Sequence, residues 1–177
     1  PFVDELLTEA GVTLTQLDGI AFGQGPGSFT GVRIGVAITQ GLAFGADLPT
    51  VGISSLATMA QQAISENNAD TIVAAIDARM SEVYLGHYQS EQGVAVLQGI
   101  ETVIKPEEIE PKDFSSCVAV GTGWQTYQQI LNDKFGSQNS DVFLPNAKFM
   151  LPLAISKFNN NLGVLAEHAQ PNYVRDE

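Results

Sequence analysis

The sequence predicts an α/β fold with a mixed sheet. Segments typical of strands alternate with segments typical of helices, which is the pattern of parallel strands joined by helical crossovers. Two later strand-like segments meet at Gln92-Gly93, a turn that favours an antiparallel hairpin. Hydrophobic residues make up 44% of the 177 residues, so the chain can bury a core of ordinary size.

The chain opens with a predicted helix and a predicted strand. Residues 2–10 place apolar side chains at helical spacing, and Gly11 is a typical helix stop. Residues 18–23 predict a short strand, which leads into the glycine-rich loop at 23–27.

A long helix is predicted from Ser28 to about Phe44, because Ser28 is a favourable N-cap and apolar residues follow it at helical spacing. Later elements follow from similar patterns. They are strands at 51–53, 72–76, 82–89, 94–104, 117–121 and 141–144, and helices capped by Ser54 or Ser55, at 124–135 and at 150–158.

Charge argues against direct binding of nucleic acid. The formal net charge is -12, and Arg33 and Arg79 are the only full positive charges before Lys105. Binding to phosphates requires several basic side chains. We therefore expect no direct contact with RNA and a basic protein partner instead.

The single cysteine, Cys117, excludes an internal disulfide and favours a cytoplasmic location. No apolar run approaches the roughly 20 residues that span a bilayer, so no membrane contact is expected. The chain begins at Pro1 without a methionine, and we expect that a preceding segment is missing.

The glycine loop allows two interpretations. Gly25 and Gly27 lead into the start of a helix at Ser28, and a helix N-terminus can hold an anion. The spacing matches neither standard phosphate-binding motif, and no lysine is nearby. A tight structural turn is the interpretation that the residues favour.

The helix after this loop is apolar on more than one side. Phe29, Val32, Val36 and Ala43 share one side, and Ile34, Ala37, Ile38 and Leu42 share another. An ordinary surface helix has one apolar stripe. The helix is therefore expected to be covered on two sides. Its own sheet would cover one side. The other side would be covered either by the rest of the chain or by the helix at 2–10 together with a partner.

Candidate catalytic groups are few. His87 and His168 are far apart in the sequence, so no metal site is predicted. Ser28 lacks the spacing of a hydrolase nucleophile. Asp77, Arg79 and Glu82 follow a buried strand and are expected to order a turn through an ion pair rather than to catalyse a reaction. No catalytic residue is predicted.

One long block resembles a known family. The residues AFGQGPGSFTGVRIGVAITQGLAFGADLPTVGISSLATMA, at 21–60, are similar to the signature of the TsaB family, also called YeaZ. Weaker matches follow in the same order at 74–88, 120–127, 145–154 and 171–175. Together they cover nearly the whole chain.

The resemblance implies an actin-like ATPase (ASKHA) architecture with two lobes of ribonuclease-H type. Residues 1–105 would be the remainder of an incomplete first lobe, with the GPGSFTG helix and a β-hairpin, and 106–177 a smaller second lobe. The family's opening strands and its last residues are absent from this sequence.

The resemblance also implies a function. The chain is expected to be a non-catalytic subunit that pairs with the enzyme TsaD, which transfers threonylcarbamoyl to adenosine in tRNAs that read codons starting with A. The small ATPase TsaE is a further expected partner, and the chain alone is expected to form homodimers. The alternatives are an actin-like nucleotide-binding protein and a glycopeptidase homologue.

Two sets of site residues follow from the resemblance. The family's dimer surface corresponds to the helices at 2–10 and 28–44, and the expected interface residues are Phe2, Leu6, Phe29, Thr30, Val32, Arg33, Val36, Thr39 and Gln40. A nucleotide, if held at all, would lie at Gly25, Gly27, Ser28, Gly121 and Gly123. No cofactor is expected, and ATP would bind only weakly or through partners.

Overall fold

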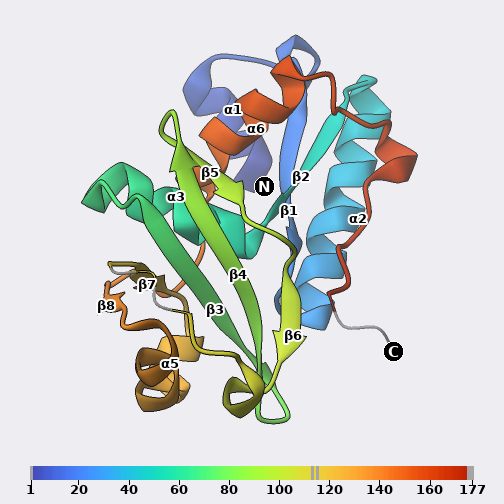
Figure 1. The fold of residues 1–177 in the computed structure, drawn as a ribbon. Helices are drawn as coiled ribbons and strands as arrows, with labels where there is room; N and C mark the ends of the chain where they lie inside the picture. Colours follow the sequence, from blue (N-terminus) through green and yellow to red (C-terminus); the bar gives the residue numbers. More distant parts are fainter. Residues whose placement is uncertain (1, 113, 115, 175–177) are drawn as a thin grey trace.

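The structure, a computed structural model, describes residues 2–112, 114 and 116–174. Two sheets organise it (Figure 1). In the smaller sheet, β1 (Ile20–Gly25) and β2 (Thr50–Ser54) pair in parallel. Arg175, the last residue of the final matching motif, lies outside the described residues.

The larger sheet combines antiparallel and parallel pairs in the order β5-β4-β3-β7-β8, with β6 also paired to β4. β3 pairs antiparallel with β4 and parallel with β7. The bounds are β3 (Thr71–Arg79), β4 (Glu82–Glu91), β5 (Val94–Leu97), β6 (Thr102–Ile104), β7 (Val118–Val120) and β8 (Gln138–Asn139).

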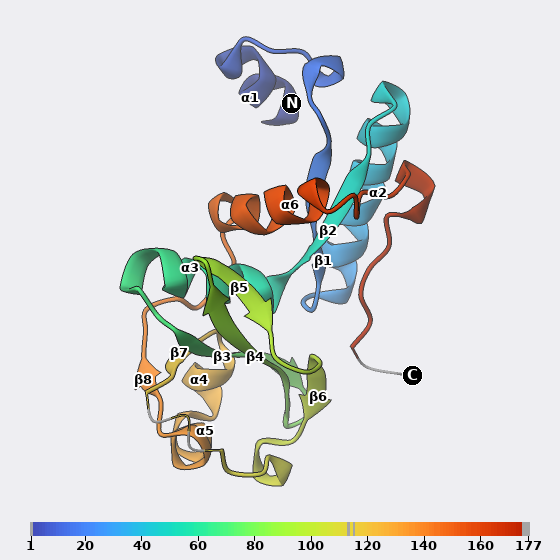
Figure 2. The same cartoon turned by 45° about the horizontal axis from the view of Figure 1, so that its top comes forward.

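Helices flank both sheets. α2 lies along one side of the small sheet, α6 crosses its other side, and α1 stands away from the rest of the molecule (Figure 2). The bounds are α1 (Phe2–Ala10), α2 (Phe29–Ala46), α3 (Ser55–Asn67), α4 (Gly123–Thr126), α5 (Gln128–Phe135) and α6 (Met150–Asn159). Short 3-10 helices lie at Leu14–Gln16, Pro106–Glu108, Ala147–Phe149 and Ala166–His168.

Two buried apolar clusters hold the fold together. The larger one joins β2 and α3 to the facing side of β3 and includes Ile53, Leu56, Met59 and Ile72, each at most 1% exposed. The second lies on the other face of the large sheet, where Trp124 packs near Phe135. Burying a large apolar side chain contributes about 1.5–3 kcal/mol, so these clusters are the main source of stability.

Several predicted features are confirmed. The Ser28 hydroxyl caps α2, and the Ser54 hydroxyl accepts hydrogen bonds from the first two backbone N–H groups after the start of α3. α1 ends at Ala10, before Gly11. The hairpin turns at Gln92 and Gly93, which both have positive φ, as a primed turn requires.

Other predicted boundaries are wrong. The strand predicted at 94–104 is divided into β5 and β6 by the loop at 98–101. The helix predicted at 124–135 breaks at Tyr127, whose φ of -124° and ψ of 30° are not helical. Residues 141–144 form no strand, and the edge strand is instead β8.

The strand pairing does not follow the predicted division at residue 105. β3 and β4 lie before that residue and β7 lies after it, yet all three belong to one sheet. The polar segment at 106–112 is therefore a connection within the larger sheet.

Within the described residues, no helix is both long enough and apolar enough to cross a bilayer.

Candidate functional site

The long helix α2 is the most unusual surface element of the chain. Its 18 residues contain one charged side chain, Arg33, and no acidic one. The Ser28 hydroxyl accepts from the N–H of Gly31 at 3.4 Å, and Asp47 ends the helix in the left-handed conformation. The helix is therefore fixed at both ends, although its sides are almost without charge.

The inner side of α2 is held by the chain itself. Val36, Thr39 and Ala43 are 5%, 6% and 0% exposed. The Gln40 side-chain amide donates to the Ala169 carbonyl at 2.8 Å. These contacts leave no room for a partner on this side.

This burial corrects part of the predicted interface. Val36 and Thr39 face the body of the molecule, and Gln40 is bound to Ala169. Val32 is half-buried against a small third cluster of Phe22, Val36 and Ala169. Because the helix is apolar all round, the sequence could not distinguish its inner side from its outer side.

The outer side of α2 is apolar and open. Ile34 and Ile38, one turn apart, are 55% and 53% exposed, and Gly41 and Gly45 continue the same side. A Cβ added at either glycine would meet no atom within 4 Å. We call the surface formed by Thr30, Gly31, Ile34, Ala37, Ile38, Gly41 and Gly45 the outer face of α2.

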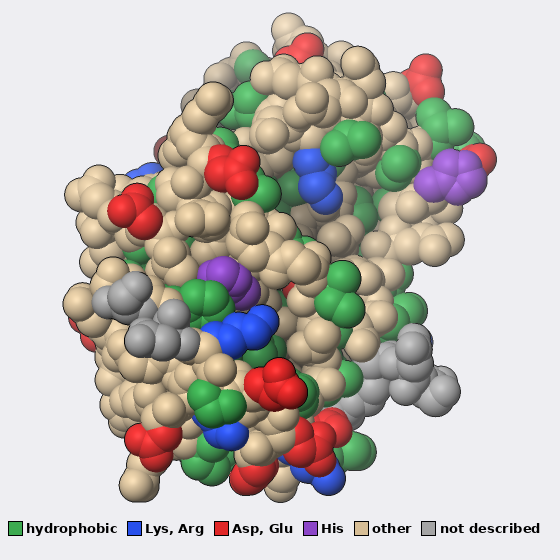
Figure 3. Space-filling model, in the orientation of Figure 1, with side chains coloured by type: hydrophobic (Ala, Val, Ile, Leu, Met, Phe, Trp, Pro, Cys, Tyr) green, Lys and Arg blue, Asp and Glu red, His purple; other side chains and the backbone are tan. Residues whose placement is uncertain are grey.

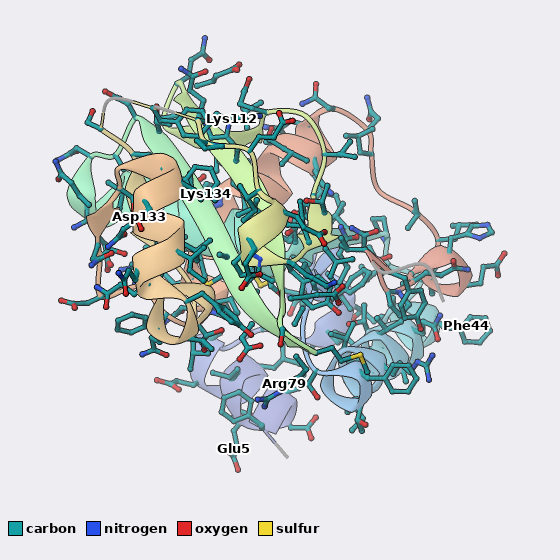
Figure 4. All side chains as sticks on the ribbon, turned by 60° about the horizontal axis from the view of Figure 1, so that its bottom comes forward. Glu5, Phe44, Arg79, Lys112, Asp133 and Lys134 are labelled. Atoms are coloured by element: carbon teal, nitrogen blue, oxygen red, sulfur yellow. The ribbon has the colours of Figure 1, made fainter. Side chains whose placement is uncertain are left out.

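Aromatic side chains lie at both ends of this face. Phe44 projects away from the end of the helix and is 80% exposed (Figure 4). At the start of the helix, the Arg33 guanidinium lies 3.4 Å from the centre of the Phe29 ring and donates through Nε to the Tyr173 hydroxyl at 3.0 Å. The predicted residues Phe29, Thr30 and Arg33 are all exposed.

The first helix does not cover α2, contrary to one expectation. No residue of α1 is buried, and Phe2 and Leu6 are 71% and 51% exposed. α1 lies on the other side of the small sheet from α2 (Figures 1 and 2). The two predicted interface helices therefore offer separate apolar surfaces.

A cleft of about 880 Å³ opens beside the start of α2. Gly25, Gly27 and Ser28 line one wall, and residues 76–80 at the end of β3 line another. Residues 171–174 also line it, held by the hydrogen bond from the Asn172 N–H to the Gln24 carbonyl at 2.8 Å.

The other predicted nucleotide residues do not line this cleft. Gly121 and Gly123 pack directly against β3, where a Cβ on Gly121 would run into the Ala75 carbonyl oxygen. These two glycines are needed for close packing of backbone. The structure therefore does not unite the two halves of the predicted nucleotide site in one cavity.

The turn predicted near Asp77, Arg79 and Glu82 is the tip of the β3–β4 hairpin. Arg79, Met80 and Ser81 have φ values of 64°, 51° and 60°, in the left-handed region that such residues seldom adopt. The Asp77 carboxylate accepts from the Arg79 N–H at 2.8 Å and so supports the turn. A hydrogen bond from a backbone N–H to a side-chain carboxylate thus orders this turn. Arg79 lies at the tip of the hairpin in Figure 4.

No group of three or more metal-ligating side chains occurs in the part of the chain that the structure describes. His87 lies on β4, where its ring stacks on Phe114 at 4.0 Å, and His168 lies in an exposed 3-10 helix. Burial, and then the charge of Lys112, lowers the pKa of His87. The two histidines therefore lie in separate elements of the fold.

Basic side chains are also dispersed. On the face drawn in Figure 3, the blue side chains lie apart from one another rather than in one patch. The face drawn there therefore has no concentrated patch of positive charge, the feature that phosphate binding requires.

The two layered α/β units with a cleft between them define the actin-like, two-lobed class of protein. A family model described as "TsaD: tRNA N6-adenosine threonylcarbamoyltransferase" matches residues 1–176. The tRNA threonylcarbamoyladenosine biosynthesis protein TsaB of Escherichia coli (strain K12) is 45% identical, over 99% of this chain and 78% of that protein. The chain belongs to the TsaB (YeaZ) family.

Solved structures agree with this assignment. A Pseudomonas aeruginosa protein described as having similarity to peptidase YEAZ superposes with a TM-score of 0.91 at 44% identity, over 98% of this chain and 81% of that one. A shorter match links the chain to the enzyme itself. The tRNA N6-adenosine threonylcarbamoyltransferase of Geobacter sp. (strain M21) is 46% identical over 54 residues, which are 30% of this chain and 16% of that protein.

Proposed function

We propose that this chain is a non-catalytic scaffold and activator subunit. It pairs with a TsaD-like enzyme and supports the transfer of threonylcarbamoyl to adenosine in tRNAs that read codons starting with A. Membership of the TsaB family supports the pathway, and the match to the TsaD model supports pairing between related folds.

The outer face of α2 is the observation that carries this proposal. It combines exposed isoleucines with glycines that leave its surface open, and none of its seven members is charged. Small residues at such positions let a second helix approach closely, and removing the isoleucines from water favours association. A homodimer would use the same face when the enzyme is absent.

The remaining partners follow from the same scheme. A TsaE-like ATPase would join the pair, and the enzyme would supply the contact with tRNA, because this chain carries a net charge of -12. A cytoplasmic location remains a prediction from the single cysteine, which is buried.

The test is a charge placed in the outer face. Ile38→Arg adds a charge to an exposed position, so the monomer should fold normally, but pairing with a TsaD-like protein should weaken by about tenfold or more because the charge would be desolvated. Co-purification and analytical ultracentrifugation measure pairing, and circular dichroism checks the fold.

A matched control exists in the other half of the molecule. Leu144 is 70% exposed and lies outside every helix and strand, so Leu144→Arg adds the same charge to a similar side chain. It should leave pairing unchanged. Normal pairing of the Ile38→Arg protein, or equal loss in both variants, would contradict the assignment of the interface.

The cleft beside α2 supports a second candidate, an actin-like nucleotide-binding protein. Our proposal predicts no heat of binding when ATP and Mg²⁺ are added to the chain alone. Gly27→Val is the suitable probe, because a Cβ at Gly27 would meet only Val32, at an ordinary 3.6 Å. Tight ATP binding that this variant abolishes without unfolding the chain would favour the second candidate.

A further inference from the structure

A second cavity, of about 680 Å³, lies between the end of β2, the strand β5 and the helix α6. Most of its wall is apolar, and residues 172–174 lie along it. A cavity of this size is in the range of small-molecule sites. The apolar lining residues that matter below are Ile53, Ala57, Val96 and Leu153.

One acidic side chain in this cavity is incompletely bonded. Glu101 Oε1 accepts hydrogen bonds from the hydroxyls of Ser54 and Tyr88. Glu101 Oε2 is closed to solvent and has no hydrogen-bond partner among the described residues. A buried carboxylate oxygen without a donor is uncommon in folded proteins, and a bound water, ion or ligand is one way in which such bonding is completed.

A basic side chain lines the same cavity. The half-buried Lys157 donates from Nζ to the Gly52 carbonyl at 2.7 Å. An ammonium group has three donors, so two remain for another molecule. Within the described residues, no ion pair of 4.0 Å or less joins Lys157 to Glu101, so neither charge neutralises the other by direct contact.

We propose that this cavity binds a small zwitterionic molecule with an apolar body, of the size of an amino acid or a dipeptide. Its ammonium group would donate to Glu101, its carboxylate would accept from Lys157, and its apolar part would cover the aliphatic wall. The terminal torsion of a glutamate side chain is soft, so a turn of the whole carboxylate group can bring one of its oxygens to the cavity wall.

The chemistry of the wall argues for a ligand rather than for water alone. One water occupies about 30 Å³, and water is held where several polar partners surround it. Here two oppositely charged groups are set into a mainly aliphatic surface, which is the arrangement of a site that fixes the orientation of a ligand by a few polar contacts.

Calorimetry with defined probes tests the proposal. L-leucine and L-leucyl-L-leucine carry both charges, whereas N-acetyl-L-leucine amide carries neither. At least one zwitterion should bind, and the blocked probe should bind about tenfold more weakly or not at all. Glu101→Gln and Lys157→Met should each lower the affinity for the zwitterion about tenfold or more.

Matched controls are Glu110→Gln and Lys134→Met, which remove the same charges from an exposed and a half-buried position outside the cavity and should leave binding unchanged. Amide chemical-shift mapping gives an independent readout, with the largest changes expected at Ala57 and Val96. If Glu101→Gln does not fold, the Lys157→Met protein and the mapping decide.

The proposal is overturned if neither zwitterion binds at millimolar concentration, if the blocked probe binds equally well, or if the mapped changes lie elsewhere. The outcome is separable from the proposed function, because the cavity does not include the outer face of α2. The Ile38→Arg protein should still bind the zwitterion.

Discussion

Single glycines show how closely the larger sheet is packed. A Cβ on Gly123 would lie 2.9 Å from the Ala75 Cβ and 3.0 Å from the Ala75 carbonyl oxygen. Both groups belong to the packed center of β3 and cannot move away easily. Gly123, one of the predicted nucleotide residues, is thus explained by its contact with the sheet.

Gly123→Ala should therefore destabilise the chain by about 1–3 kcal/mol, because the new methyl group overlaps packed atoms. Urea unfolding followed by circular dichroism measures this change. Gly23→Ala is the control, since nothing lies within 4 Å of a Cβ there, and its effect should stay within about 0.5 kcal/mol. Equal effects of the two changes would contradict the packing argument.

Tyr88 is the residue whose ionisation is most strongly constrained. Burial, followed by the negative charge of Glu101, raises the pKa of the Tyr88 hydroxyl well above its ordinary value of 10.0. In the unfolded chain this hydroxyl loses its proton near its ordinary pKa, whereas in the folded chain it keeps the proton. The unfolded state is therefore favoured progressively as the pH rises above that value.

The free energy of unfolding should accordingly fall as the pH rises above about 10, and Tyr88→Phe should reduce the slope. Absorbance at the phenolate band gives a direct check. At alkaline pH the folded wild type should lack the phenolate absorbance of Tyr88, and Tyr88→Phe should therefore leave the absorbance of the folded chain unchanged. A Tyr88 that titrates with the exposed tyrosines would contradict the burial argument.

At the scale of elements, α2 illustrates a conflict between helix stability and association. Gly31, Gly35, Gly41 and Gly45 occur in one helix, and each costs up to about 1 kcal/mol relative to alanine. Gly41 has no neighbour within 4 Å of a Cβ in the chain itself. The absence of a side chain at Gly41 therefore does not help packing within the chain itself. It would help a partner helix to pack closely against α2.

Gly41→Ala should thus stabilise the monomer by about 0.5–1 kcal/mol and, at the same time, weaken pairing, because the methyl group separates the two helices. Thermal unfolding of the monomer and sedimentation of the pair measure the two effects. Stronger pairing in the alanine variant would show that Gly41 lies outside the contact.

For the whole molecule, charge and apolar surface act in opposite directions. Each chain carries a net charge of -12, so two copies repel one another, whereas the outer face of α2 has no charge of its own. Salt screens the repulsion and leaves the apolar attraction intact.

The homodimer should therefore become more populated as sodium chloride rises from about 0.1 to about 1 M, a range over which the Debye length falls from about 10 to about 3 Å. Sedimentation equilibrium at several salt concentrations measures this dependence. A dimer that dissociates in salt would mean that ion pairs, rather than the outer face of α2, hold it together.

The sequence by itself determined the features that depend on local chemistry. Ser28 and Ser54 cap helices because their hydroxyls reach nearby backbone N–H groups, and Gln92-Gly93 turns a hairpin because both residues tolerate positive φ. The signature at 21–60 determined the family. The net negative charge of the chain favoured a protein partner over nucleic acid.

Only the tertiary structure decided which side of α2 is free. The helix is apolar around most of its circumference, so its sequence does not indicate which side faces the rest of the chain. In the structure Val36 is packed against the chain, whereas Ile38 is exposed. The cluster of Ser54, Tyr88 and Glu101 was equally hidden, because these residues come from three separate segments that sheet packing brings together. Local patterns specify elements, but contacts between distant segments arise from the packing of the whole chain.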